Sequence, residues 1–297
     1  MAIVDQSYQP WSGDLQPRRR RIGAMVRVGI RQAYAGLMAK ILLLSTYLMV
    51  FGTIGILFIA STFQQSVAIV SGNNIYRFYL GSIFPTGILI MTLAALVGGR
   101  SIANDLRFNA VSMYFSKAIT RTDYLVGKWA TVSAFLLSGT LVPALLLWIC
   151  QWAISREEIS AGSRAMDLLA LTGHSLVIVL PIAMYALALS SLSRNAFVPG
   201  ILWVMTFFGS IIVSGILTER VEEDWCKLVS WHNLATRLGE ALYEKRVVKV
   251  QALGSNLMPI EGTMPYPWYV PAAILGGITL VSALFVLWRM RKFEGQE

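Results

Sequence analysis

The sequence predicts an all-α integral membrane protein with six transmembrane helices, an N-terminal amphipathic interfacial helix and a short cytoplasmic helix between the second and third spans. Three observations lead to this fold class. The chain of 297 residues is 56% hydrophobic and only 14% charged, whereas soluble domains carry about 25% charged residues. It contains six long uncharged apolar runs. The segments that separate those runs are alternately rich and poor in Lys and Arg.

Each of the six apolar runs is long enough to cross a hydrocarbon core as a helix, which takes roughly 20 residues. None of them contains Asp, Glu, Lys or Arg. About 40 polar and basic residues precede the first run, so we interpret it as a retained helix and not as a cleaved signal peptide. The predicted spans are 41–61, 81–99, 129–154, 168–190, 197–217 and 270–288.

The distribution of Lys and Arg predicts the orientation of these spans. Sixteen of the 25 basic residues fall in segments on one side: seven before residue 41, five in 100–128, Arg194, and three after residue 288. Positively charged segments stay in the cytoplasm, so both termini are expected there. The net charge of +9 is then a consequence of topology, and no nucleic-acid partner is needed to explain it.

Residues 1–40 are expected to form a cytoplasmic arm and an interfacial helix, and residues 41–297 the six-helix transmembrane domain. Ile22, Val26 and Ile30 recur at helical spacing, while Arg27 and Arg31 fall on another face. This pattern is typical of an amphipathic helix at a membrane surface. The preceding four arginines, 18–21, suit contacts with anionic headgroups of membrane lipids.

Segment 100–128 interleaves charged and aromatic residues between two apolar runs. We expect a short helix over 102–115. Thr120 and Asp123 have the spacing of a capping box, with a hydroxyl at the N-cap and an acid three residues later. The third helix should therefore start near Arg121 and project beyond the membrane before its apolar part begins.

The fifth span carries a stripe of small polar residues, Thr206, Ser210 and Ser214, which predicts either close helix packing or part of a pathway. After it, 218–268 forms the only large outer loop. Leu234, Leu238 and Leu242 lie at helical spacing there, so we expect short helices that cap the outer side of the bundle.

No catalytic set is recognisable in the chain. It lacks H-E-x-x-H, G-x-S-x-G and the phosphate-binding loop G-x-x-x-x-G-K-[ST], so we expect a non-catalytic protein without cofactor or metal of its own. Cys150 and Cys226 have no metal spacing, and whether they pair is open. Since the spans also lack the midplane charges that ion-coupled carriers use, energy is expected from another subunit.

The run GGRSIANDLRFNAVSMYFSKAITRTDYLVGK resembles the segment after the second span in ABC transporter permeases of the type-2 (ABC-2) exporter family, in which the six-span membrane subunit is separate from its ATPase. Ala118 stands where that family often has proline. The positions that carry the resemblance are Gly99, Ile102, Ala103, Asp105, Tyr114, Ser116, Thr120, Arg121, Gly127 and Lys128.

The resemblance implies a permease of the bacterial inner membrane that pairs with a second permease, identical or paralogous, and with two cytoplasmic ATP-binding subunits, which hold ATP and Mg. Segment 100–128 would be the coupling helix region, and the cargo lipid-like, peptide or otherwise amphipathic. The alternatives are an ion-coupled carrier or channel without an ATPase, and a scaffold or assembly subunit. The implied ATPase-coupling interface comprises Arg100, Asp105, Arg107, Phe108, Tyr114, Phe115, Arg121, Asp123 and Lys128.

Overall fold

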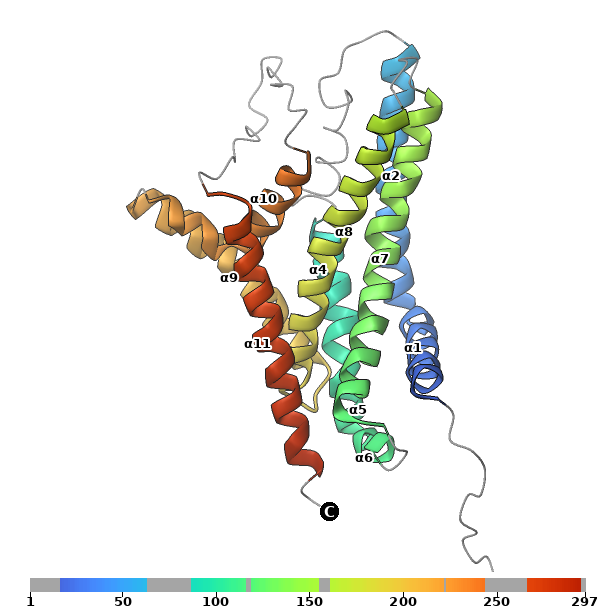
Figure 1. The fold of residues 1–297 in the computed structure, drawn as a ribbon, viewed down its shortest axis with the longest axis vertical. Helices are drawn as coiled ribbons and strands as arrows, with labels where there is room; N and C mark the ends of the chain where they lie inside the picture. The colour runs from blue at the N-terminus through green and yellow to red at the C-terminus, as the bar shows by residue number, and fades with distance from the viewer. Residues whose placement is uncertain are drawn as a thin grey trace, which may run out of the picture.

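The computed structural model describes residues 17–62, 87–115, 119–154, 161–221, 223–243 and 266–294. Within these residues the chain is helical and contains no strand. Six helices are long and apolar enough to cross a membrane, which confirms the predicted fold class (Figure 1). The elements are α1 Arg18–Ala35, α2 Leu37–Thr62, α4 Ile88–Leu93, η2 Ala94–Gly98, α5 Gly99–Arg107, α6 Ala110–Phe115, α7 Arg121–Ile154, α8 Ala161–Ser190, α9 Phe197–Val221, η3 Asp224–Val229, α10 Trp231–Tyr243 and α11 Tyr269–Glu294.

The second span departs from its predicted bounds. Its helix does not end at Gly99 but passes through a π-helical turn, η2, and continues as α5 to Arg107. The single short helix expected over 102–115 is therefore wrong: the first half belongs to the span, and α6 is separate. The break falls at Asn109, whose φ of 52° lies in the left-handed region that Asn tolerates and that ends a helix.

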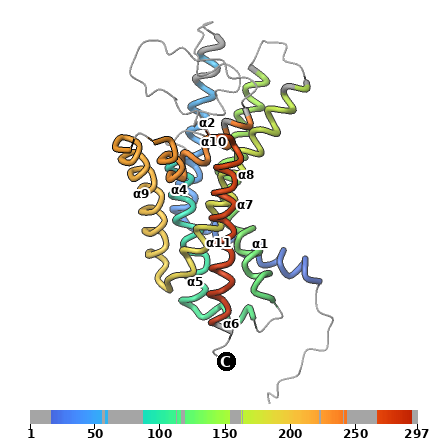
Figure 2. The backbone as a smooth tube through the Cα atoms, turned by 60° about the vertical axis from the view of Figure 1, so that its left-hand side comes forward, coloured from blue at the N-terminus to red at the C-terminus, as the bar shows by residue number. Residues whose placement is uncertain are grey.

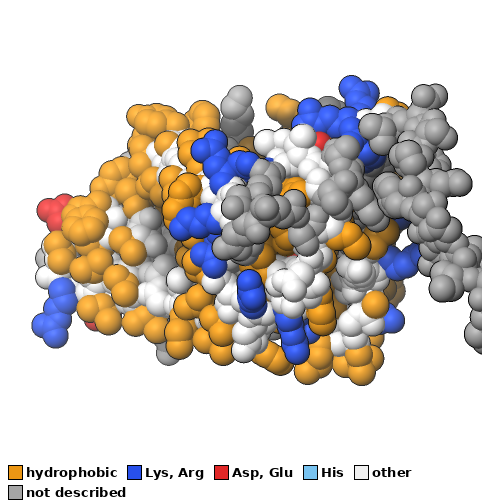
Figure 3. Space-filling model, turned by 90° about the horizontal axis from the view of Figure 1, so that it is seen from below, with side chains coloured by type: hydrophobic (Ala, Val, Ile, Leu, Met, Phe, Trp, Pro, Cys, Tyr) orange, Lys and Arg blue, Asp and Glu red, His pale blue; other side chains and the backbone are white. Residues whose placement is uncertain are grey.

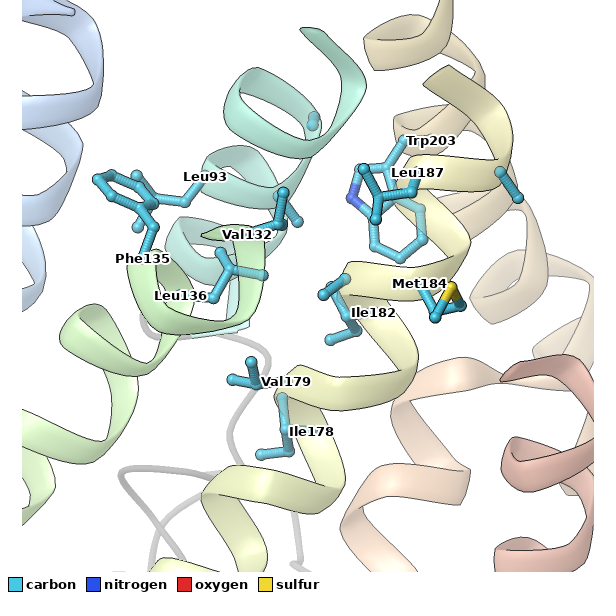
Figure 4. Packing of buried hydrophobic residues seen from close by; sticks show 14 of the residues in the cluster. Leu93, Val132, Phe135, Leu136, Ile178, Val179, Ile182, Met184, Leu187 and Trp203 are labelled. Carbon is cyan, nitrogen blue, oxygen red and sulfur yellow. The ribbon is translucent and has the colours of Figure 1, made fainter. Parts of the chain in front are cut away.

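The apolar core lies where α7 and α8 pack together at the centre of the bundle. Half of the apolar stretch that could cross the membrane is buried in α7 and in α8, as in the second span, compared with 17% in α2, 17% in α9 and 22% in α11. In Figure 4, side chains of α7 and α8 interdigitate, with Leu93 of α4 and Trp203 of α9 closing the two sides. The more exposed helices present Leu44, Ile212 and Leu284 outward, each more than half exposed, as expected for a surface that faces lipid.

The bundle has two distinct ends. One end, which we call the α6 end, carries α5, α6, the start of α1 and the end of α11 (Figures 1 and 2). The other, the α10 end, carries η3 and α10. The two ends of the described chain therefore lie on the same side, as an even number of spans requires. Figure 3 shows that Lys and Arg side chains gather on the α6 end, with hydrophobic side chains around them.

Helix α1 packs against the part of α7 nearest the α6 end and crosses the bundle instead of running along it (Figure 2). Gly29 allows the close approach, because a Cβ there would lie 2.7 Å from Thr131 Cγ2. The Tyr34 hydroxyl donates to Ser138 Oγ at 2.6 Å. Arg27 and Arg31 are exposed, on the face turned away from α7, as the amphipathic pattern predicts.

Candidate functional site

The residues implied in partner binding converge at the α6 end, where α5, α6 and the start of α7 meet (Figure 1). Ile102, Ala103 and Leu106 of α5 are buried, whereas Arg107 and Phe108 are exposed. The α5 helix is thus held firmly by its apolar face while its end points out of the bundle. This arrangement gives an exposed tip on a rigid support.

A hydroxyl from α8 is built into the backbone of α5. Ser190 Oγ accepts hydrogen bonds from the N–H groups of Ile102 and Ala103, both at 2.9 Å, and donates to the carbonyl of Gly99 at 2.6 Å. Ala103 N–H and Gly99 C=O are partners in a regular helical turn, so the hydroxyl is inserted between them, a recognised cause of helix bending. These contacts directly follow the π-helical turn, and both features lie at the junction between the membrane part of the span and α5, which we call the hinge as a candidate site of bending.

The tip consists of residues 107–109, the turn between α5 and α6, together with Met113 of α6. Phe108 is 72% exposed and Met113 is 53% exposed. The Arg107 guanidinium lies 5.5 Å from the centre of the Phe108 ring, a cation–π distance. The α6 end is otherwise basic (Figure 3). An exposed aromatic ring and an exposed methionine on such an end are typical of a surface that contacts a partner.

Behind the tip lies a compact polar group that we call the Asp105 cluster, formed by Asp105, Tyr114, Tyr124 and Lys128. Asp105 Oδ2 accepts a hydrogen bond from the Tyr124 hydroxyl at 2.7 Å. It also forms an ion pair with Lys128 Nζ at 2.7 Å. The two charged side chains are only 15% and 9% exposed. Lys128 Nζ also donates to the Ser101 carbonyl at 3.1 Å, so the pair ties α5 to α7.

Aromatic rings complete the Asp105 cluster. Lys128 Nζ lies 5.7 Å from the Tyr124 ring centre and 6.0 Å from that of Tyr114. Phe115 packs edge-on against Tyr124, with ring centres 6.1 Å apart. Burial raises the pKa of the Tyr114 phenol, and the nearby Asp105 carboxylate raises it further. Tyr114 therefore stays protonated, and its ring and that of Phe115 pack α6 against the buried Tyr124 of α7.

The start of α7 has the capping box that the sequence predicts. Asp123 N–H donates to Thr120 Oγ1 at 3.2 Å, and Thr120 N–H donates back to Asp123 Oδ2 at 3.4 Å. Arg121 begins the helix. Asp123 also accepts from Arg18 Nε at 2.5 Å, its own side chain being 5% exposed and that of Arg18 63%. This ion pair joins the first residue of α1 to the first turn of α7.

Of the predicted interface, Arg107 and Phe108 are presented outward, and Asp105, Tyr114, Phe115, Asp123 and Lys128 make contacts within the chain. Arg100 lies apart from the tip, with its guanidinium 5.4 Å from the centre of the Phe197 ring. The sequence alone missed the role of Ser190 and the partner of Arg18, which the pattern of arginines 18–21 assigned to lipid headgroups. No local pattern marks either contact, since each partner lies about 90 to 105 residues away.

The small polar stripe of α9 packs against the α10-end cap. Ser214 Oγ donates to the Cys226 carbonyl at 2.8 Å, and Ser210 Oγ accepts from the Trp231 N–H at 3.3 Å. Thr206 bonds only its own helix, at the Trp203 carbonyl. Of the two readings left open by the sequence, these contacts favour helix packing. The expected outer helices are present as η3 and α10, and residues 244–265 of that loop lie outside the described part.

The histidines and cysteines do not form a metal site in the part of the chain that the structure describes. Cys150 and Cys226 are free thiols. His174 of α8 is buried against Gly239 of α10, where a Cβ would overlap its ring. His232 lies in the first turn of α10. The His174 imidazole therefore belongs to the contact between α8 and α10.

Fold and site together define a six-span, all-helical membrane protein with a structured basic end. Comparison with known proteins found no family model that matches this chain and no curated protein similar to it.

Proposed function

We propose that this chain is the membrane-spanning permease subunit of an ATP-driven exporter of the ABC-2 type, acting with a second permease and with separate cytoplasmic ATP-binding subunits. The observation that carries the proposal is the construction of segment 99–128. An exposed tip at Arg107 and Phe108 stands on a buried ion pair that links α5 directly to α7. A partner pressing on the tip would therefore move two spans together.

The hinge at Ser190 supports a mechanical role for this segment. The Ser190 hydroxyl holds the turn Gly99 to Ala103 through three hydrogen bonds, immediately after the π-helical turn. Gly99 also lies against Gly200 of α9, where a Cβ would be 3.1 Å from the Gly200 nitrogen. Close contacts of this kind let one helix slide or tilt on another, as shear motions require. ATP-driven movement of the tip would bend the second span here.

Not all charged residues of segment 100–128 would face a partner in this proposal. The tip supplies the docking groups, an apolar ring beside a cation, and suits a groove that is apolar inside with an acidic rim. Asp105 and Lys128 transmit the movement to α7 and need not touch the partner. The orientation proposed for this end is cytoplasmic, because Lys and Arg side chains gather on it (Figure 3).

The test is co-purification in mild detergent from the native membrane. We expect an ATP-hydrolysing subunit in equimolar ratio to this chain. Phe108→Glu should abolish its recovery, because a carboxylate replaces the docking ring next to Arg107. Trp225→Ala is the matched control: Trp225 is an exposed aromatic at the α10 end, 47% exposed, and its loss should leave the complex intact.

Two outcomes would count against the proposal. One is recovery of the complete complex with the Phe108→Glu variant. The other is a chain that purifies without an ATPase and, in liposomes, moves solute down an imposed ion gradient, which would favour the carrier alternative.

A further inference from the structure

Three arginines from separate segments of the chain lie in or beside the short turn between α8 and α9, residues 191–196. Arg194 lies in the turn and is exposed. Arg289 of α11 reaches it, with Nη2 donating to the Leu192 carbonyl at 2.9 Å. Arg100 of α5 lies over Phe197, the first residue of α9. The fold thus concentrates positive charge where residues almost 100 positions apart meet.

This charge has no carboxylate partner in the described chain. The ion pairs found there are Arg18–Asp123, Lys128–Asp105 and Lys227–Asp224, and the turn itself contains no acid. In addition, Arg289 Nε is buried without a hydrogen-bond partner among the described residues. A guanidinium placed this way is prepared to donate to an oxyanion that offers two acceptors.

The surroundings of the turn are apolar. Leu192 is 40% exposed, Phe197 is 68% exposed and Trp288 is 50% exposed. Lys292 Nζ lies 4.2 Å from the Trp288 ring centre. The candidate spans of α9 and α11 begin and end near this turn, at Phe197 and Lys292, which is where lipid headgroups meet the ends of membrane helices.

We propose that the α8–α9 turn binds the phosphate of an anionic phospholipid through Arg100, Arg194 and Arg289. The guanidiniums complement the phosphate charge, and the exposed Leu192 and Phe197 contact the glycerol and acyl region, which a free phosphate ion lacks. Basic sites between transmembrane helices recognise anionic headgroups in this manner. The bound lipid would join α5, α9 and α11 at their shared end, and the inference does not depend on the transport role.

Native mass spectrometry of the delipidated full chain in detergent tests this, with phosphatidylglycerol and phosphatidylcholine of equal acyl length as probes. We expect a single preferential phosphatidylglycerol site. Arg289→Gln and Arg194→Gln should each weaken phosphatidylglycerol binding about fivefold, with phosphatidylcholine unaffected. Arg194 is exposed in the turn, so its variant stays informative if Arg289→Gln does not fold. Arg220→Gln removes an exposed cation from the last turn of α9 at the opposite end and should bind like the unmodified chain.

Inorganic phosphate in excess should not displace the lipid. Displacement by phosphate would identify a site for soluble anions and overturn the lipid assignment. Equal binding of the two lipids, unchanged binding in both turn variants, or an equal loss in Arg220→Gln would overturn it as well.

Discussion

The Asp105 carboxylate illustrates at the residue scale how the surroundings of a side chain alter the role that its sequence position implies. From the sequence, a charged residue between two spans is expected to face solvent or a partner. In the structure, Asp105 is largely buried and receives both an ammonium and a phenol. Such a pair costs much to desolvate and is stable only while both partners are present.

Asp105→Asn should therefore destabilise the protein by about 3 to 5 kcal/mol, because Lys128 is left buried without a counter-charge. The double change Asp105→Asn with Lys128→Met should recover most of the loss. Asp224→Asn, which breaks the exposed pair with Lys227, serves as control and should cost less than about 1 kcal/mol. Thermal unfolding in detergent measures all of these variants, and equal effects of Asp105→Asn and Asp224→Asn would contradict the buried pair.

His232 makes stability depend on pH. Burial lowers the pKa of its imidazole to about 4 from the ordinary 6.5, so between these values the unfolded chain binds the extra proton. The stabilisation is fully present above pH 6.5 and is lost as the pH falls towards 4, by up to about 3 kcal/mol. We expect His232→Gln to show a smaller loss of melting temperature between pH 7.5 and pH 4.5. Parallel pH profiles of the two proteins would exclude this role.

At the element scale, the second span shows how a helix is shaped by its neighbours. Local sequence predicts a membrane run that stops at Gly99, since Arg100 follows it. Packing of Ile102, Ala103 and Leu106 and the bonds from Ser190 extend the helix by about two turns beyond Gly99. The capping box of α7, by contrast, involves residues three apart, and it forms as the sequence predicts.

Ser190→Ala should destabilise the hinge by about 1 to 3 kcal/mol, because one buried carbonyl and two buried N–H groups lose a shared partner. Ser191→Ala is the matched control: Ser191, directly after α8, is also buried, but the bond shown for its hydroxyl is to the Ala188 carbonyl three residues earlier in α8. Amide hydrogen exchange of residues 102–103 checks the site directly. Unchanged protection there in Ser190→Ala would show that the inserted hydroxyl does not hold α5.

At the scale of the whole molecule, the two ends of the bundle differ in structure and in charge. The α6 end is basic and carries the tip, and the α10 end is covered by η3 and α10, with Trp231 packed against Tyr185 and Trp203 at ring distances of 5.3 and 6.0 Å. Tyr185 is five residues from the α6 end of α8 and Trp203 six residues from the α6 end of α9, so the start of α10 reaches into the bundle and joins these two helices.

The orientation is tested by cysteine labelling in a background with Cys150→Ala and Cys226→Ala. Met113→Cys and Arg194→Cys at the α6 end should react with a membrane-impermeant maleimide only after cells are permeabilised, because positively charged segments remain in the cytoplasm. Trp225→Cys at the α10 end should react in intact cells. The reverse labelling pattern would invert the proposed topology.

The sequence by itself determined the all-helical membrane class, the six spans and the cap of α7. These follow from composition, from runs of about 20 apolar residues and from contacts within a few positions, all of which are local properties. The tertiary structure decided that Asp105 faces Lys128, that Ser190 enters the backbone of α5 and that Arg100, Arg194 and Arg289 share one turn. Each of these contacts joins separate segments, and the choice of partner depends on how whole helices pack, which no single segment encodes.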